Sequence, residues 1–182
     1  MYYYPYMYQN PGYMNAQMYN YGVPSSYSPS PARPGTASGQ LVLELKDYGP
    51  YPLALNIDEA TKQNNTFRTA LWSGENLQVT LMSLGEGEDI GLEIHPDVDQ
   101  FLRIEQGQGI VQMGKNKELL DFTTAVADGA AIFIPKGTWH NVINTGYMPL
   151  KLYSIYSPPN HPAGTIHQTK ADAEAAEKEY HS

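Results

Sequence analysis

The sequence contains no cysteine among its 182 residues. This absence excludes disulfide frameworks, thiolate metal sites and cysteine nucleophiles. Basic clusters are also missing and the formal net charge is −8, so we expect neither nucleic acid nor an anionic membrane as a partner. No apolar run approaches the roughly 20 residues of a bilayer span. The N-terminus lacks the charged start and apolar core of a secretory signal, which predicts cytoplasmic synthesis without a signal peptide.

Charged and aliphatic side chains are scarce in residues 1–40, where Arg33 is the one charged residue. This segment instead holds nine of the 15 tyrosines, four of the seven methionines and six of the 14 prolines. So little Leu, Ile and Val cannot bury enough surface to offset the loss of chain entropy. We predict a disordered leader and linker over residues 1–40 and one folded domain over residues 41–182.

Residues 41–182 have the pattern of an all-β domain. Short β-prone runs alternate with turns that contain Gly or Pro, which favours a sandwich or barrel over βαβ units. Two short flanking helices are predicted, over 57–62 with Asn56 as the cap, and over 170–180 with a capping box of Thr169 and Asp172. The expected strands cover 41–45, 67–72, 77–84, 91–95, 101–105, 109–113, 131–134, 140–144 and 150–156.

Two of the five histidines lie inside this strand region. Because side chains alternate along a strand, Glu93 and His95 are expected to share a face, and Gln100 follows on the next strand. His140 begins another strand, after a turn that contains Pro135. Two hairpins that direct these groups to one interior can build a metal site of nitrogen and oxygen ligands.

The segment around His140 resembles the second motif of the cupin superfamily, G-(x)5-P-x-G-(x)2-H-(x)3-N. All five motif positions match, at Gly129, Pro135, Gly137, His140 and Asn144. The resemblance implies a small jelly-roll barrel, also called a double-stranded β-helix. Such barrels are often dimeric and hold a metal inside the barrel mouth, so a homodimer is expected.

The first cupin motif, G-(x)5-H-x-H-(x)3–4-E-(x)6-G, matches less fully. Gly87, His95 and Gly107 fit, but Glu93 replaces the first histidine and Gln100 replaces the glutamate. Cupins with the full set bind Mn, Fe, Ni, Cu or Zn, so the resemblance implies a divalent transition metal held by Glu93, His95, Gln100 and His140. Two imidazoles and one carboxylate match the ligand count of a non-haem Fe(II) site. A metal-free, hydrogen-bonded polar cluster is the alternative.

Three functions are open at this point. The first is a metal-dependent oxygenase or isomerase that acts on an unidentified small molecule, with Glu93 as the general base if it is not a ligand. The second is a barrel that binds a sugar, a polyol or an acid without turnover. The third is a structural component of a bacterial spore coat or similar layer. There the Tyr-rich leader would engage other proteins, because its composition resembles that of spore-coat leaders.

Other charged and ionisable residues receive simpler predictions. Arg68 could reach a substrate carboxylate, but an exposed strand position is expected for it. Arg103 has the opposite strand parity to Gln100 and is expected to point away from the site. Capping or solvent exposure is expected for the three remaining histidines, His161, His167 and His181.

Overall fold

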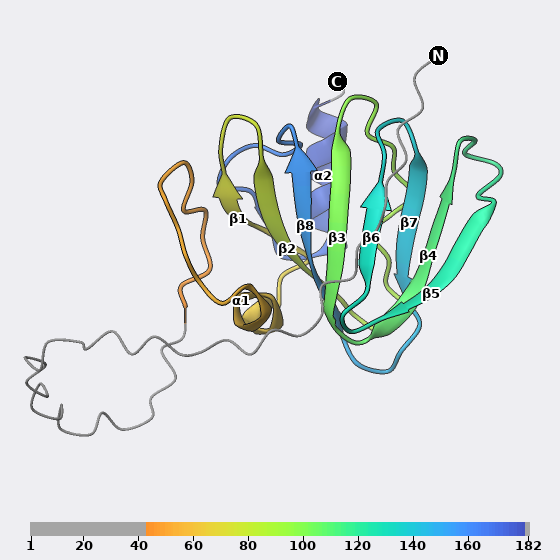
Figure 1. Cartoon of the computed structure of the whole chain (residues 1–182), viewed down its shortest axis with the longest axis horizontal. Coiled ribbons are helices and arrows are strands. Elements are labelled where there is room, and N and C mark those ends of the chain that lie inside the picture. Colours follow the sequence, from red (N-terminus) through yellow and green to blue (C-terminus); the bar gives the residue numbers. More distant parts are fainter. Residues whose placement is uncertain (1–42, 181–182) are drawn as a thin grey trace, which may run out of the picture. The chain divides into compact units, whose positions relative to one another are not determined.

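The computed structural model describes residues 43–180, so the predicted leader and His181 lie outside the described residues. Within this range the chain forms two antiparallel sheets and two short helices (Figure 1). The six-stranded sheet has the spatial order β6 (Ala131–Ile134), β3 (Asp99–Gln106), β8 (Leu150–Ser157), β2 (Gln78–Leu84), β1 (Arg68–Ser73) and β9 (Ile166–His167). The three-stranded sheet has the order β5 (Phe122–Ala127), β4 (Gln108–Gly114) and β7 (Trp139–Asn144). The predicted all-β class with two flanking helices is confirmed.

Both helices begin at their predicted caps. The Asn56 side chain accepts a hydrogen bond from the Glu59 amide at 3.3 Å and starts α1 (Ile57–Gln63). At the start of α2 (Lys170–Tyr180), the Thr169 amide donates to Asp172 Oδ2 at 2.8 Å, and the Asp172 amide donates to Thr169 Oγ1 at 3.3 Å. This reciprocal pair is the predicted capping box. Neither helix of the described range has the length and hydropathy of a membrane span.

The main core lies between the two sheets, and it is apolar at one end and polar at the other. Strand alternation places Leu102 and Ile104 of β3 on the same face as Gln100, and all three are buried. The same change from apolar to polar occurs on β8 and β2 of this sheet, where Ser154 and Thr80 are buried, and His140 is buried on β7 of the other sheet. Helix α2, seen behind β8 in Figure 1, adds Ala173 to the apolar part. The polar end of the interior is therefore the place where a site can form.

A second, smaller core covers the outer face of β1 and β2. Leu71 and Leu81 pack there against Ala60 of α1, with Leu43 and Leu45 beside them. Strand β1 is consequently buried on both faces over its first four residues. An arginine at the start of such a strand is buried whichever face it occupies.

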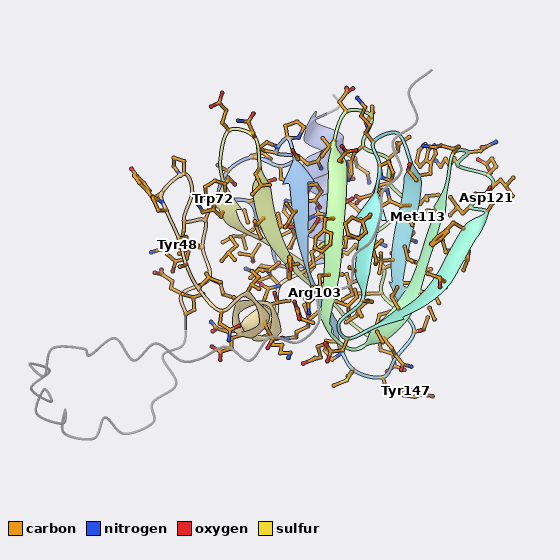
Figure 2. All side chains as sticks on the ribbon, viewed as in Figure 1. Tyr48, Trp72, Arg103, Met113, Asp121 and Tyr147 are labelled. Carbon is orange, nitrogen blue, oxygen red and sulfur yellow. The ribbon has the colours of Figure 1, made fainter. Side chains whose placement is uncertain are left out.

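Some of the predicted strands were wrong. Residues 43–45 of the expected first strand form no strand, and Leu43 and Leu45 pack against the second core instead. The segment 91–95 has only an isolated bridge between Glu93 and His140, and Gly91 adopts a φ of 91° that interrupts regular pairing. Strands β5 and β9 were not predicted. Arg103 on β3 (Figure 2) behaves as expected: its side chain is 45% exposed and pairs with Glu105.

Candidate metal site

Backbone hydrogen bonds join the two motif segments. The Glu93 amide donates to the His140 carbonyl at 3.0 Å, and the His140 amide donates to the Glu93 carbonyl at 2.9 Å. Three residues before His140, the Gly137 amide donates to the His95 carbonyl at 2.8 Å. Gly137 adopts a φ of 68°, which favours glycine. These three bonds hold Glu93, His95 and His140 in one fixed arrangement even though 91–95 is not a regular strand.

The side chains of Glu93, His95 and His140 converge at the polar end of the interior. One potential ligand atom from each residue lies within 4.8 Å of the other two. Nε2 of His95 and Nε2 of His140 are each 3.3 Å from Oε1 of Glu93. Both imidazoles are buried, whereas the Glu93 side chain keeps 17% of its surface exposed. Three of the four predicted ligands are therefore brought together, and the cluster can be reached at its carboxylate.

The position of the proton on the His140 ring shows whether this cluster fits a cation. Nδ1 of His140 lies 2.9 Å from the Thr138 carbonyl oxygen, and a carbonyl only accepts, so Nδ1 carries the proton. With the proton on Nδ1, Nε2 is the ring atom that faces the Glu93 carboxylate, and it is the atom that a metal would bind. That contact is attractive only with a proton or a cation between the two atoms. A backbone carbonyl that fixes the tautomer in this way is typical of metal-binding histidines, so the donor set fits a divalent metal.

The ionisation of Glu93 is consistent with a ligand role. Burial opposes its ionisation, but hydrogen bonds with His140 and His95 and the positive charge of Arg68 outweigh burial. Together they hold the pKa of Glu93 far below its usual range. A carboxylate with such a low pKa is a weak general base, which favours the ligand role over the catalytic role considered for Glu93.

Gln100, the fourth predicted ligand, lies on the same inner face. Its Nε2 donates to Ser154 Oγ at 3.0 Å, and its Oε1 is buried without a hydrogen-bond partner among the described residues. In this arrangement the Nε2 end of the amide is used by Ser154. The free end is an oxygen, the atom a metal would use, but Gln100 stays a prediction as a ligand.

Variants of Gln100 test its role. Gln100→Ala is expected to lower metal retention less than His140→Ala does, because it removes a neutral amide instead of an imidazole. Gln100→Glu is expected to increase retention, because a carboxylate binds a dication more strongly than an amide. The measurement is metal per chain after gel filtration. Equal retention in both Gln100 variants and the unchanged protein would exclude a ligand role.

A cavity of about 590 Å³ adjoins the cluster. Its wall includes Glu93 and His95, together with Arg68, His161 and His167. The predictions for these last three residues were wrong. Arg68 is 1% exposed because it lies on the inner face of β1, paired with Met82 of the main core, and His161 and His167 are half-buried along the cavity. Strand parity alone could not reveal this, because it does not say which face of β1 is covered or how the chain after β8 returns.

The burial of His161 predicts a pH dependence of stability. Burial first, and then the charge of Arg68, lower the pKa of His161 to about 3, whereas an imidazole in an unfolded chain titrates near about 6.5. At a pH between these two pKa values, the His161 imidazole binds a proton in the unfolded chain but not in the folded chain. The free energy of unfolding therefore falls as the pH drops below about 6.5. One proton corresponds to about 1.4 kcal/mol per pH unit. Urea unfolding between pH 7 and 5 is expected to show a shallower slope for His161→Asn than for the unchanged protein; equal slopes would contradict this pKa.

The last residue of the second motif has a structural role. Nδ2 of Asn144 lies within hydrogen-bonding distance of three backbone carbonyls, those of Leu84, Gly85 and Met148, at 2.9 to 3.0 Å. Its Oδ1 accepts from the Gly146 amide at 2.9 Å. Asn144 therefore holds the loops beside β2 and β7 together and does not belong to the metal cluster.

The fold and this cluster define a cupin, and the comparisons agree. The cupin domain family matches residues 80–156. An uncharacterized Bacillus subtilis protein, YrkC, is 74% identical over 135 residues, which are 74% of this chain and 73% of that protein. The chain therefore belongs to the cupin family.

Two further relatives extend the comparison. An uncharacterized protein of Acanthamoeba polyphaga mimivirus is 46% identical over 113 residues, covering 62% of this chain and 69% of that protein. A crystal structure from Bacillus halodurans aligns with a TM-score of 0.71 and 62% identity, over 72% of this chain and 99% of that one. These names assign no activity.

Proposed function

We propose that this cupin binds one divalent transition metal through Glu93, His95 and His140 and acts as a metal-dependent enzyme on a small molecule held in the adjoining cavity. The observation that carries the proposal is the convergence of two imidazoles and one carboxylate beside that cavity. This donor set is that of non-haem Fe(II) oxygenases, which leave metal positions open for other ligands. We therefore favour an oxygenase over an isomerase.

Each residue of the cluster would have a separate role in holding the metal. The imidazole of His140 is fixed by its bond to the Thr138 carbonyl, whereas the bond to Gly137 fixes the backbone of His95, whose ring packs edge-on against Tyr156. Glu93 supplies the negative charge that offsets part of the dication. A bound metal would supply Lewis-acid or one-electron chemistry. The cavity wall would hold and orient the small molecule.

Nitric oxide tests this proposal without a known substrate, because it occupies the position that dioxygen would take on iron. The full-length protein is stripped with EDTA, loaded with Fe(II) without air and exposed to nitric oxide. The expected result is an iron–nitrosyl EPR signal that His140→Ala does not give. Retention of Fe(II) without a nitrosyl signal would favour an isomerase, and failure to retain any divalent metal would contradict the proposal.

The scaffold alternative depends on the leader, residues 1–40, which lies outside the described residues. Incorporation into a spore coat or similar layer stays a prediction, as does a homodimer.

A further inference from the structure

Arg68 stands out among the charged groups of the described chain. It is one of the largest fully buried side chains, yet Nε and Nη1 have no hydrogen-bond partner among the described residues. No carboxylate of residues 43–180 forms an ion pair with it. An arginine is always charged, and burying an uncompensated charge costs folding free energy. Packing alone does not explain an arginine at this place.

Arg68 lies in the wall of the cavity beside the metal cluster. It begins β1, where it pairs with Met82 of β2 on one side and with His167 of β9 on the other. Its guanidinium carbon lies 5.6 Å from the centre of the Phe67 ring, a contact that helps to hold the side chain in place. Arg68 and Glu93 line the same cavity, so a molecule in it can contact the guanidinium and the metal cluster together.

The other ionisable groups of the cavity wall form no ion pair with Arg68 in the described chain, although its charge acts on Glu93. Burial first, and then the charge of Arg68 itself, lower the pKa values of His161 and His167, so both imidazoles are neutral near pH 7. Nδ1 of His167 is also buried without a partner among the described residues. Glu93 belongs to the metal cluster, and Glu177 of α2 is exposed and forms no ion pair with Arg68 in the described chain.

We propose that Arg68 is a carboxylate-binding residue, and that the molecule held in the cavity is a small organic acid whose carboxylate pairs with the Arg68 guanidinium. The identity of that acid as the substrate rests on the proposed function; the carboxylate site itself does not. Arginine suits this role because its planar guanidinium forms charge-assisted, bidentate bonds with carboxylates. A single cation among neutral imidazoles matches one negative charge better than a phosphate dianion.

The test uses propionate, which carries one carboxylate, and propionamide, its uncharged analogue. Both are titrated by NMR into the full-length protein, as purified and after EDTA treatment. We expect propionate to bind and propionamide not to bind. In Arg68→Gln, propionate affinity is expected to fall by about tenfold or more. The matched control, Arg103→Gln, removes the same charge from an exposed position on β3 and is expected to leave affinity unchanged.

Several results would overturn the proposal: equal propionate affinity in Arg68→Gln and the unchanged protein, no preference over propionamide, or tighter binding of inorganic phosphate. Arg68→Met checks folding independently. It is expected to be at least as stable as the unchanged protein, because it removes a buried charge that has no ion-pair partner among the described residues. Lower stability of Arg68→Met would mean that Arg68 has a structural role and would contradict the proposal. Metal content is measured on the same samples, so propionate binding without metal retention would overturn the proposed function alone.

Discussion

His140→Ala is expected to remove nearly all bound metal, whereas the unchanged protein retains about one ion per chain. The imidazole of His140 is fully buried, its tautomer is fixed by the Thr138 carbonyl, and its Nε2 is 3.3 Å from Glu93. Removing it leaves one imidazole and one carboxylate, too few ligands for tight binding. The measurement is mass-spectrometric metal content after gel filtration.

Two further variants provide a second test of the site and a control. Glu93→Gln is expected to be nearly as severe, because it removes the negative charge that offsets the dication. His167→Ala, a histidine of the same cavity outside the cluster, is the matched control and is expected to retain its metal. Equal metal content in His140→Ala and the unchanged protein would refute the site and favour the metal-free polar cluster.

Asn144→Ala is expected to lower the free energy of unfolding by about 2–4 kcal/mol. The variant leaves three carbonyls and one amide without their side-chain partner, and Asn144 is only 1% exposed. Urea unfolding measures the loss. Metal content per folded chain is expected to stay unchanged, since the Asn144 side chain contacts backbone groups and not the cluster.

The control for Asn144 is Asn116→Ala. Asn116 is exposed and its side chain accepts one hydrogen bond, from the Glu118 amide at 3.0 Å. Its loss is expected to change the free energy of unfolding by no more than about 1 kcal/mol. Similar losses for the two variants would contradict the structural role of Asn144, as would loss of metal from Asn144→Ala without loss of stability.

Local sequence signals predicted the bounds of an element correctly where they mark both of its ends. The bounds of β6 and α2 match the predicted segments 131–134 and 170–180, because strong turns and a capping box mark their ends. Strand β5 was missed because five of its six residues are exposed, so it lacks the alternation that marks a half-buried strand. The two-residue strand β9 is too short to carry any pattern.

The sequence predicted the residues of the metal cluster but not the residues around it. Glu93, His95 and His140 occupy motif positions, and the structure brings them together. The surroundings of the cluster were not predictable. Charged residues are rarely buried, so Arg68 was expected at the surface. Arg68 is buried because it pairs across the sheet with Met82 of the main core and lines the cavity beside Glu93, a tertiary arrangement that strand parity does not report.

The most direct test of the metal site is anomalous X-ray diffraction from crystals of the full-length protein loaded with Zn(II) or Fe(II), recorded on both sides of the metal absorption edge. We predict one anomalous peak per chain at the Glu93, His95 and His140 cluster, with ligand distances of about 2.0–2.2 Å for a Zn-like ion. A peak elsewhere, or no peak at this cluster in the metal-loaded protein, would contradict the account.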